Sequence, residues 1–213
     1  MPRVSIDGQS VSVPDGATVI DAARAAGIVI PTLCYRETLP AQTSCMVCVV
    51  RIDGAARLAP SCATKVREGM VIESQSDEVQ KARRMALELL LSDHDLKCRE
   101  CPANRNCALQ KIAKGRGLKL RQKRFTLIER DYELDDSPAE FAFNRSRCVL
   151  CGQCVWADRR ENEIGVIGFA RRGINRVVTT FQDLPLAESI CKECTVCVDV
   201  CPVGALYYKK TAE

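Results

Sequence analysis

The spacing of apolar residues divides the start of the chain into short elements. Apolar and polar residues alternate in RVSIDGQSVSVP on both sides of Asp7-Gly8, which predicts a β-hairpin. Thr18 then opens a short helix over VIDAARAAG, and Gly27 closes it. MVCVVRIDG and MVIES predict further strands. This order of hairpin, helix and strands indicates a β-grasp domain in residues 1–76.

The clearest helix is predicted over residues 77–94, DEVQKARRMALELLLSDH. Apolar residues recur there at helical spacing and predict one apolar stripe with charges opposite. The members of the stripe are Val79, Ala82, Met85, Ala86, Leu89 and Leu90. With a shorter helix over CALQKIAKG, residues 77–117 are expected to form a small helical domain. A charged connector over 118–139 and a third domain over 140–213 complete a predicted α+β protein.

Fourteen cysteines among 213 residues are well above ordinary usage, and they fit disulfides, zinc, iron–sulfur clusters or catalytic thiols. The N-terminus has no apolar signal segment, and no apolar run approaches the roughly 18 residues of a membrane span. We therefore expect a cytoplasmic protein without a membrane span, where cysteine clusters more often hold metal than form disulfides. The formal charge of +4 counts every cysteine as neutral, so cluster binding makes the protein less basic.

The first predicted site is spaced C-x10-C-x2-C-x13-C along the chain. Three ligands on one loop and a distant fourth are the arrangement of a 2Fe–2S ferredoxin, although the plant-type gap of four residues is replaced by ten. Zinc is the alternative, but zinc ribbons favour two C-x2-C pairs and this site has one. The predicted ligands are Cys34, Cys45, Cys48 and Cys62.

The second predicted site contains the only histidine of the chain, in the spacing H-x3-C-x2-C-x5-C. Its members are His94, Cys98, Cys101 and Cys107. Four ligands complete a 4Fe–4S site, and exchanging a thiolate for a neutral imidazole lowers the negative charge of the site. In Rieske centres the same exchange raises the reduction potential. Zinc bound by three cysteines and a histidine is the alternative.

Two further sites follow from the C-x2-C-x2-C-x3 pattern of bacterial ferredoxins. The run CKECTVCVDVCP is complete, whereas the run CVLCGQCVWAD has Asp158 where its fourth cysteine is expected. In two-cluster ferredoxins the last ligand of each run binds the other cluster. The predicted third site is therefore Cys148, Cys151, Cys154 and Cys201, and the fourth is Cys191, Cys194, Cys197 and Asp158.

Three states are open for the fourth site. A carboxylate can bind iron, although it is a harder ligand than a thiolate, so the first state is a 4Fe–4S cluster with Asp158 as a ligand. The second state is a three-iron cluster, or a cluster completed by water or by a partner's ligand. The third state is an empty site, which leaves three correctly spaced cysteines without an explanation.

The ordered motifs IPTLCY, SCMVCVV, HDLKCRECPANRNCALQ, RCVLCGQC and CPVGAL resemble one family of electron-transfer regions. The chain is similar to the N-terminal region of iron-only hydrogenases and to the large peripheral-arm subunit of NADH dehydrogenase. It is also similar to the small diaphorase subunit of NAD-reducing nickel–iron hydrogenases and to the N-terminus of NAD-linked formate dehydrogenases. The family implies one 2Fe–2S cluster and two to three 4Fe–4S clusters. Asp158 departs from the two-cluster pattern of the family, and we expect no catalytic domain within residues 1–213.

The resemblance predicts an electron-transfer subunit that is not catalytic by itself. Its expected partners are a flavin-containing NAD(P)H-binding subunit and a catalytic subunit of hydrogenase or formate dehydrogenase type. The order of the sites along the chain suggests a relay from the 2Fe–2S site through the histidine site to the ferredoxin domain. The alternative function is a zinc-stapled nucleic-acid-binding or adaptor protein, for which the basic segment KGRGLKLRQKR is the main support. We expect no nucleic acid, because basic connectors are more often solvated or docking surfaces.

Overall fold

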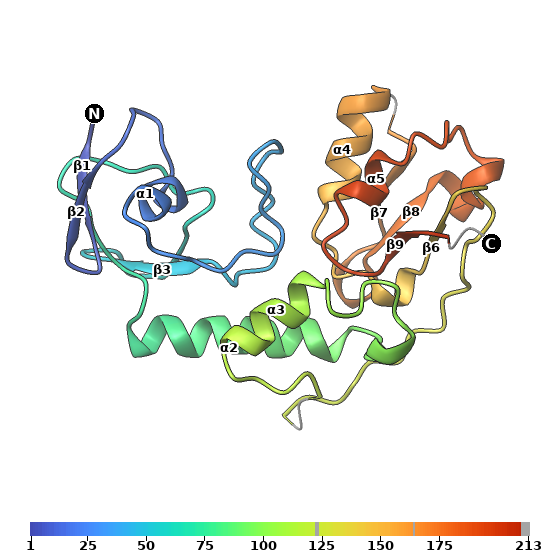
Figure 1. Cartoon of the computed structure of the whole chain (residues 1–213), viewed down its shortest axis with the longest axis horizontal. Coiled ribbons are helices and arrows are strands. Elements are labelled where there is room, and N and C mark those ends of the chain that lie inside the picture. The colour runs from blue at the N-terminus through green and yellow to red at the C-terminus, as the bar shows by residue number, and fades with distance from the viewer. Residues whose placement is uncertain (122–123, 164, 210–213) are drawn as a thin grey trace.

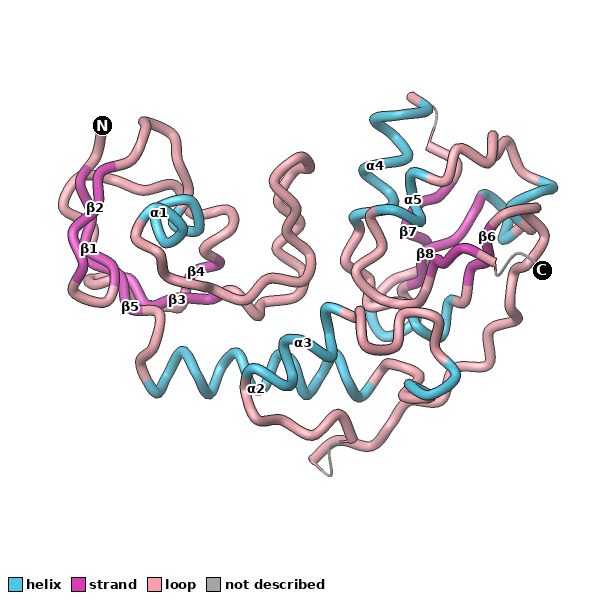
Figure 2. The backbone as a smooth tube through the Cα atoms, viewed as in Figure 1, coloured by secondary structure: helices cyan, strands magenta, loops and turns pink. Residues whose placement is uncertain are grey.

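The computed structural model describes residues 1–121, 124–163 and 165–209 and has the shape of two units bridged by a long helix. The N-terminal sheet unit and the C-terminal cysteine-rich unit lie side by side, and helix α2 (Asp77–Ser92) runs beneath both (Figure 1). Figure 2 shows the strands gathered in these two units, with α2 and α3 between and below them. The protein is therefore a mixed helix and strand fold, as the sequence predicts.

The N-terminal sheet has five strands in the order β2-β1-β5-β3-β4. Strand β1 pairs parallel with β5, and every other neighbouring pair is antiparallel. The predicted hairpin, helix and two later strands are confirmed. The strands are β1 (Arg3–Ile6), β2 (Gln9–Ser12), β3 (Val49–Ile52), β4 (Ala59–Pro60) and β5 (Val71–Glu73), and the helix is α1 (Val19–Ala25).

Helix α1 starts after Thr18, where side chains bond the backbone N–H groups that have no partner within the helix. The Asp21 backbone N–H donates to Thr18 Oγ1, and the Thr18 backbone N–H donates to Asp21 Oδ2 at 2.8 Å, which is a capping box. The helix buries Val19, Ile20, Ala22 and Ala23 against the sheet. After Ala26, Gly27 turns the chain away with a φ of +70°, a conformation that favours glycine.

The predicted helix over 77–94 is confirmed, but the predicted apolar stripe is wrong in part. Val79 is fully buried as predicted, but Leu89 is 50% exposed, and the other fully buried side chains of the helix are Arg83, Leu87, Glu88 and Leu91. Charged residues lie on the buried face because each one finds a partner. Arg83 Nε donates to the Val49 carbonyl of β3 at 2.9 Å, and Glu88 pairs with Arg84 at 2.9 Å.

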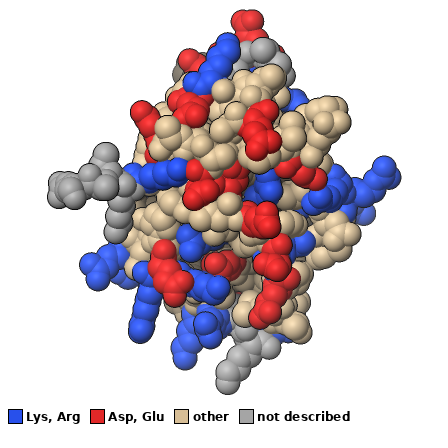
Figure 3. Space-filling model, turned by 90° about the vertical axis from the view of Figure 1, so that its right-hand side faces the viewer, with Lys and Arg blue, Asp and Glu red and all other residues tan. Residues whose placement is uncertain are grey.

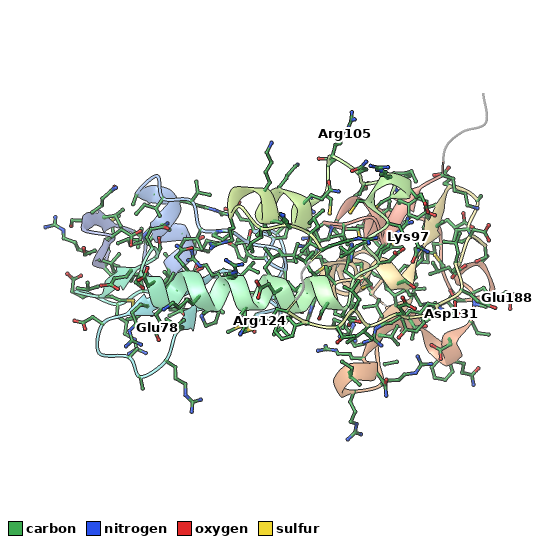
Figure 4. All side chains as sticks on the ribbon, turned by 90° about the horizontal axis from the view of Figure 1, so that it is seen from below. Glu78, Lys97, Arg105, Arg124, Asp131 and Glu188 are labelled. Atoms are coloured by element: carbon green, nitrogen blue, oxygen red, sulfur yellow. The ribbon has the colours of Figure 1, made fainter. Side chains whose placement is uncertain are left out.

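Helix α3 (Ala108–Gly115) lies beside α2, and the connector after it returns along α2 toward the C-terminal unit (Figure 1). Figure 4 shows Arg124 beside the middle of α2, and its Nη1 lies 3.5 Å from Glu88 Oε2. Farther along, Arg130 pairs with Asp93 just past the end of α2, and the Ile128 N–H donates to the Ser92 carbonyl. The connector is therefore fastened to the long helix at several points.

The C-terminal unit consists of short elements around its cysteines. Strand β6 pairs with β9, and β7 pairs with β8, both antiparallel. The regular elements are β6 (Phe141–Phe143), α4 (Gln153–Asn162), β7 (Ile167–Ala170), β8 (Val177–Thr180), α5 (Val196–Asp199) and β9 (Leu206–Tyr208). Short 3-10 turns cover Cys98–Glu100, Arg145–Arg147, Gly173–Asn175, Phe181–Asp183 and Leu186–Glu188.

Two buried clusters hold the molecule together, and cysteines belong to both. The sheet cluster includes Cys48 and Cys62. The larger cluster runs from Cys34 and Cys45 through α2 and α3 into the C-terminal unit. The surface at the C-terminal end carries basic and acidic side chains intermingled, with no extended area of one sign (Figure 3). No helix in the described part of the chain is both long enough and apolar enough to span a bilayer.

Candidate metal centres

The four cysteines of the first site are buried and lie in two close pairs. Each is at most 4% exposed. The Sγ atoms of Cys48 and Cys62 lie 3.6 Å apart, and Cys34 is hydrogen-bonded to Cys45. A 2Fe–2S cluster has two irons, each of which takes two protein ligands. The pairing therefore offers one iron position to Cys34 and Cys45 and the other to Cys48 and Cys62.

Hydrogen bonding within each pair makes one thiol more acidic than an ordinary cysteine. The bond from Cys45 lowers the pKa of Cys34 to about 5, and the bond from Cys62 lowers the pKa of Cys48 to about 6. The pKa values of Cys45 and Cys62 are raised in return, chiefly by the same hydrogen bonds. Each pair therefore shares one proton and already carries one thiolate at neutral pH, which is the form that binds iron.

The second site begins just past the end of α2 and finishes at the start of α3. His94 is buried, and its Nδ1 has no hydrogen-bond partner. Burial lowers the pKa of His94 to about 4, so the ring is neutral at pH 7 and has a lone pair to donate. Cys98 lies in the turn Cys98–Glu100, and Cys107 precedes α3. A neutral imidazole with an unpartnered Nδ1, together with the thiols of Cys98, Cys101 and Cys107, which lie near one another, fits a cluster with one nitrogen ligand.

The third site is an enclosed cavity lined by four cysteines from two distant segments. Cys148, Cys151 and Cys154 come from the loop before α4 and from its first turn, and Cys201 comes from the loop after α5. Apolar side chains such as Phe143 complete the wall. Burial raises the pKa of Cys148 to about 12. The positive charge of bound iron is therefore needed to hold these sulfurs as thiolates.

Backbone N–H groups point at the sulfurs of the third site. The Leu150 N–H donates to Cys148 Sγ at 3.4 Å, and the Leu206 N–H donates to Cys201 Sγ at 3.5 Å. Such bonds stabilise negative charge on a thiolate and thereby raise the potential of a cluster bound to it. The donor set, the enclosure and the N–H groups together fit a 4Fe–4S cluster.

The fourth site is more open than the third. Cys194 is exposed, Cys191 is half-buried, and Cys197 on α5 is 9% exposed. Asp158 on α4 is buried, and its negative charge contributes to raising the pKa values of Cys191 and Cys197, after the larger effect of burial. The carboxylate therefore lies close enough to Cys191 and Cys197 for its charge to act on them.

Asp158 also has a structural role that the sequence did not reveal. Its Oδ2 accepts the backbone N–H groups of Val166 at 2.5 Å and of Ile167 at 3.1 Å, where strand β7 begins. Two N–H donors on one oxygen fix the orientation of the carboxylate. Asp158 therefore ties α4 to β7 as well as lying near the fourth site, and the two roles use the same side chain.

The third site adjoins each of the other three. Cys45 of the first site and Cys148 of the third line one surface pocket. A Cβ built on Gly204, in the loop after Cys201, would overlap Cys101 Sγ of the second site. The charge of Cys197 of the fourth site acts on buried Cys154. Each of the other sites thus has a contact with the third, and the expected relay order, in which the histidine site lies between the first and third sites, stays a prediction.

Three side chains of α4 dock the loop of the first site onto the C-terminal unit. Gln153 donates to the Leu33 carbonyl at 2.8 Å, Trp156 Nε1 to Gln42 Oε1 at 2.6 Å, and Arg160 to the Thr38 carbonyl at 2.8 Å. Figure 1 shows this loop reaching from the N-terminal unit toward α4. Sequence spacing contains no signal for these contacts, because the partners are more than 110 residues apart.

Across residues 1–121, 124–163 and 165–209, no three His, Cys, Asp or Glu side chains converge on a point that one metal ion could fill. A cluster spreads its protein ligands over several irons, whereas a structural zinc ion draws four ligands to one centre.

Three segments match families of iron–sulfur proteins. Residues 2–77 match a 2Fe–2S iron–sulfur cluster binding domain, and residues 83–120 match the NADH-ubiquinone oxidoreductase-G iron–sulfur binding region. Residues 186–207 match a 4Fe–4S binding domain. The chain therefore contains 2Fe–2S and 4Fe–4S binding domains, as the resemblance implied, and iron–sulfur clusters are favoured over zinc.

The whole chain is similar to parts of larger oxidoreductase subunits. It is 39% identical over 211 residues to NADP-reducing hydrogenase subunit HndD of Solidesulfovibrio fructosivorans, covering 97% of this chain and 36% of that protein. It is 31% identical over 213 residues to the mitochondrial NADH-ubiquinone oxidoreductase 78 kDa subunit of Candida albicans, covering 99% of this chain and 29% of that protein. The chain thus spans about a third of the length of these two relatives.

A solved structure matches over nearly the full chain. The NAD+-reducing nickel–iron hydrogenase, crystallised in the H2-reduced state, contains a chain that superimposes with a TM-score of 0.91 and 29% identity. The match covers 99% of this chain and 88% of the hydrogenase chain. The arrangement of the two units and the bridging helix therefore recurs in a protein of comparable length.

Proposed function

We propose that this chain, an iron–sulfur protein related to NADH dehydrogenase and to NAD(P)-reducing hydrogenases, relays single electrons within a larger complex. The donor or acceptor on one side is a flavin-containing NAD(P)H-binding subunit. On the other side is a separate catalytic subunit of hydrogenase or formate dehydrogenase type. The names of the relatives support this assignment. A cytoplasmic location is part of the same proposal.

One observation carries the proposal most directly: four cysteines from two distant segments line one enclosed cavity, and that cavity adjoins the other three ligand sets. Outer-sphere electron transfer needs closely spaced redox centres and no substrate pocket. Cluster potentials are then tuned by burial and by hydrogen bonds to sulfur, both of which are present at the third site.

We assign the ligands by set. The first site holds a 2Fe–2S cluster through Cys34, Cys45, Cys48 and Cys62. The second site holds a 4Fe–4S cluster through His94, Cys98, Cys101 and Cys107, and the third holds one through Cys148, Cys151, Cys154 and Cys201. The close thiol pairs, the unpartnered imidazole and the enclosed cavity support these three assignments.

The fourth site is assigned as a cluster bound by Cys191, Cys194 and Cys197, with Asp158 at the fourth ligand position. The burial of Asp158 and the effect of its charge on two of the three cysteines support it. A carboxylate donates less electron density than a thiolate, so this cluster differs in potential from the others. A three-iron cluster at the same cysteines is the variant of this proposal.

In the relay that we propose, electrons pass between the first and third sites directly, and the second and fourth sites branch from the third. Three domains carry the sites: a β-grasp domain over 1–76, a helical domain over 77–117 and a two-cluster ferredoxin domain over 140–213, and a connector over 118–139 joins the last two. The family matches to residues 2–77, 83–120 and 186–207 fall within or close to these limits and support them.

The test of the relay function is purification of the native complex under anaerobic conditions with the chain tagged. We expect flavin and a catalytic metal, such as nickel, molybdenum or tungsten, to purify with it, and NAD(P)H to reduce its clusters. The chain itself should contain about 14 iron atoms if all four sites are filled, or about 10 if the fourth is empty. A complex with neither flavin nor catalytic metal would contradict the partner assignment.

A further inference from the structure

A pocket that none of the proposed cluster ligands lines lies between α2, α3 and the loop that follows α1. Its volume is about 570 Å³, within the range of small-molecule sites. Apolar side chains, among them Val29 and Ile112, form part of the wall. The polar part of the wall is Gln75, Gln80, Arg83, Arg84, Lys111 and Arg116. No acidic side chain of the described residues lines it, although Arg84 pairs with Glu88 and Lys111 Nζ donates to Asn106 Oδ1 at 2.9 Å.

The deepest of these cations is Arg83, which is only 1% exposed. Its Nε is occupied by the Val49 carbonyl, but its Nη2 is buried without a hydrogen-bond partner. Burial, and secondarily the nearby positive charge of Arg116, lower the pKa of Arg83 to about 10, so the guanidinium stays charged at pH 7. A buried charged N–H group without a partner is unfavourable, and an anion in the pocket would satisfy it.

Arg116 repeats the pattern on the opposite wall. Its Nη1 donates to Gln80 Oε1 at 2.5 Å, which fixes the guanidinium, while its Nε is buried without a partner. Two guanidinium groups that repel each other are thus held in place with donors still available. This is a preformed arrangement for an oxyanion, because guanidinium groups bind phosphate through parallel N–H bonds.

The acidic residues near the pocket do not neutralise it. Glu88 lies one turn along α2 from Arg84 and pairs with Arg84 and with Arg124 of the connector. Glu88 thereby compensates Arg84, and the charge of Asp7 acts on Arg83, which leaves Lys111 and Arg116 in excess. A single carboxylate balances only one of these charges, whereas a phosphate carries about −1.5 to −2 at pH 7.

We propose that this pocket binds the phosphate group of a small molecule, such as inorganic phosphate, pyrophosphate or a mononucleotide. The phosphate lies between Arg83 and Arg116, with Lys111 at the mouth and the apolar wall beside the rest of the ligand. Since the lining comes from the loop after α1, from α2 and from the end of α3, binding fastens the N-terminal unit to the helices. The first cluster site lies nearby, because the charge of Cys48 acts on Arg83 and Arg83 Nε donates to the carbonyl of Val49, the next residue.

Calorimetric titration of the anaerobically reconstituted full chain tests the proposal at physiological ionic strength, where diffuse charge attraction is screened. Inorganic phosphate, pyrophosphate and AMP are titrated in separate arms. We expect one saturable site for at least one of them. Arg116→Gln and Lys111→Gln should each weaken binding about tenfold. Lys114→Gln removes an exposed lysine of α3 that does not line the pocket, and it should leave the affinity unchanged.

A second readout is thermal, because a ligand that fastens the two parts together raises the melting temperature with increasing concentration. The rise should be present in the Lys114→Gln variant and absent in Arg116→Gln. Equal binding by these two variants would overturn the proposal. Failure of all three phosphates to bind at millimolar concentration would also overturn it. If Arg116→Gln then disrupts assembly of the native complex, the pocket holds an acidic segment of a partner subunit instead.

Discussion

The side chain of Gln153 donates from Nε2 to the main-chain oxygen of Leu33 at 2.8 Å, across 120 residues of sequence. Leu33 precedes Cys34, and Gln153 precedes Cys154, so one hydrogen bond joins the loops of the first and third sites. Gln153 is 4% exposed and Leu33 is 2% exposed. The two cluster sites are therefore held at a fixed separation by a buried contact beside their ligands.

Replacing Gln153 should loosen this contact. In Gln153→Leu the buried Leu33 carbonyl loses its donor, which should destabilise the fold by about 1–3 kcal/mol. We expect a lower melting temperature and slower electron transfer between the 2Fe–2S cluster and the third site, measured by rapid freeze-quench EPR. The matched control is Gln9→Leu on the exposed edge of β2, which should change neither. An unchanged transfer rate in Gln153→Leu would show that the contact does not set the separation.

Gly204 is predicted to be irreplaceable for steric reasons. An added Cβ would overlap Cys101 Sγ and would lie 3.3 Å from the Ala103 side chain. Gly204→Ala should therefore displace one ligand of the histidine site and remove one 4Fe–4S signal, with a loss of about four iron atoms. Gly168→Ala is the control, since nothing lies within 4 Å of its added Cβ. Full iron content in Gly204→Ala would mean that Cys101 is not a ligand in this position.

His94 should set the potential of one cluster only. In His94→Cys a thiolate replaces the neutral imidazole, and the added negative charge should lower one midpoint potential while the cluster is retained. An EPR-monitored redox titration measures this, and the other clusters serve as the internal control. His94→Ala should lose the same signal. If both variants titrate like the unmodified protein, then His94 is a buried core residue and not a ligand.

Asp158 can be tested separately as a ligand and as the anchor of β7. Asp158→Asn keeps an oxygen that accepts the Val166 and Ile167 N–H groups but removes the negative charge. Asp158→Cys supplies the ligand of the two-cluster pattern. We expect one potential to shift in the cysteine variant and one signal to weaken in the asparagine variant, with the fold retained in the latter. A potential that is unchanged in Asp158→Cys would rule out the ligand role.

Elements with strong local signals could be predicted from the sequence. The alternation around Asp7-Gly8 gave the hairpin, Thr18 gave the start of α1, and the long apolar-rich segment gave α2 within two residues at its end. The iron–sulfur domains followed from cysteine spacing, because cluster geometry restricts how ligands are distributed along the chain.

What the sequence could not predict depends on contacts between distant residues. The buried face of α2 contains Arg83 because a β3 carbonyl accepts its Nε, a fact that apolar periodicity ignores. The position of the third site beside the other three depends on docking by Gln153, Trp156 and Arg160, which no spacing rule contains. The anchoring of β7 by Asp158 was hidden for the same reason.

The central claim is that clusters of iron and sulfide fill these cysteine-lined sites. The most direct measurement is iron and acid-labile sulfide analysis of the anaerobically purified chain, together with its visible spectrum before and after dithionite. A brown protein with about 14 iron atoms, matching sulfide and absorbance that bleaches on reduction is the predicted result. A colourless protein that contains zinc and no acid-labile sulfide would contradict the account.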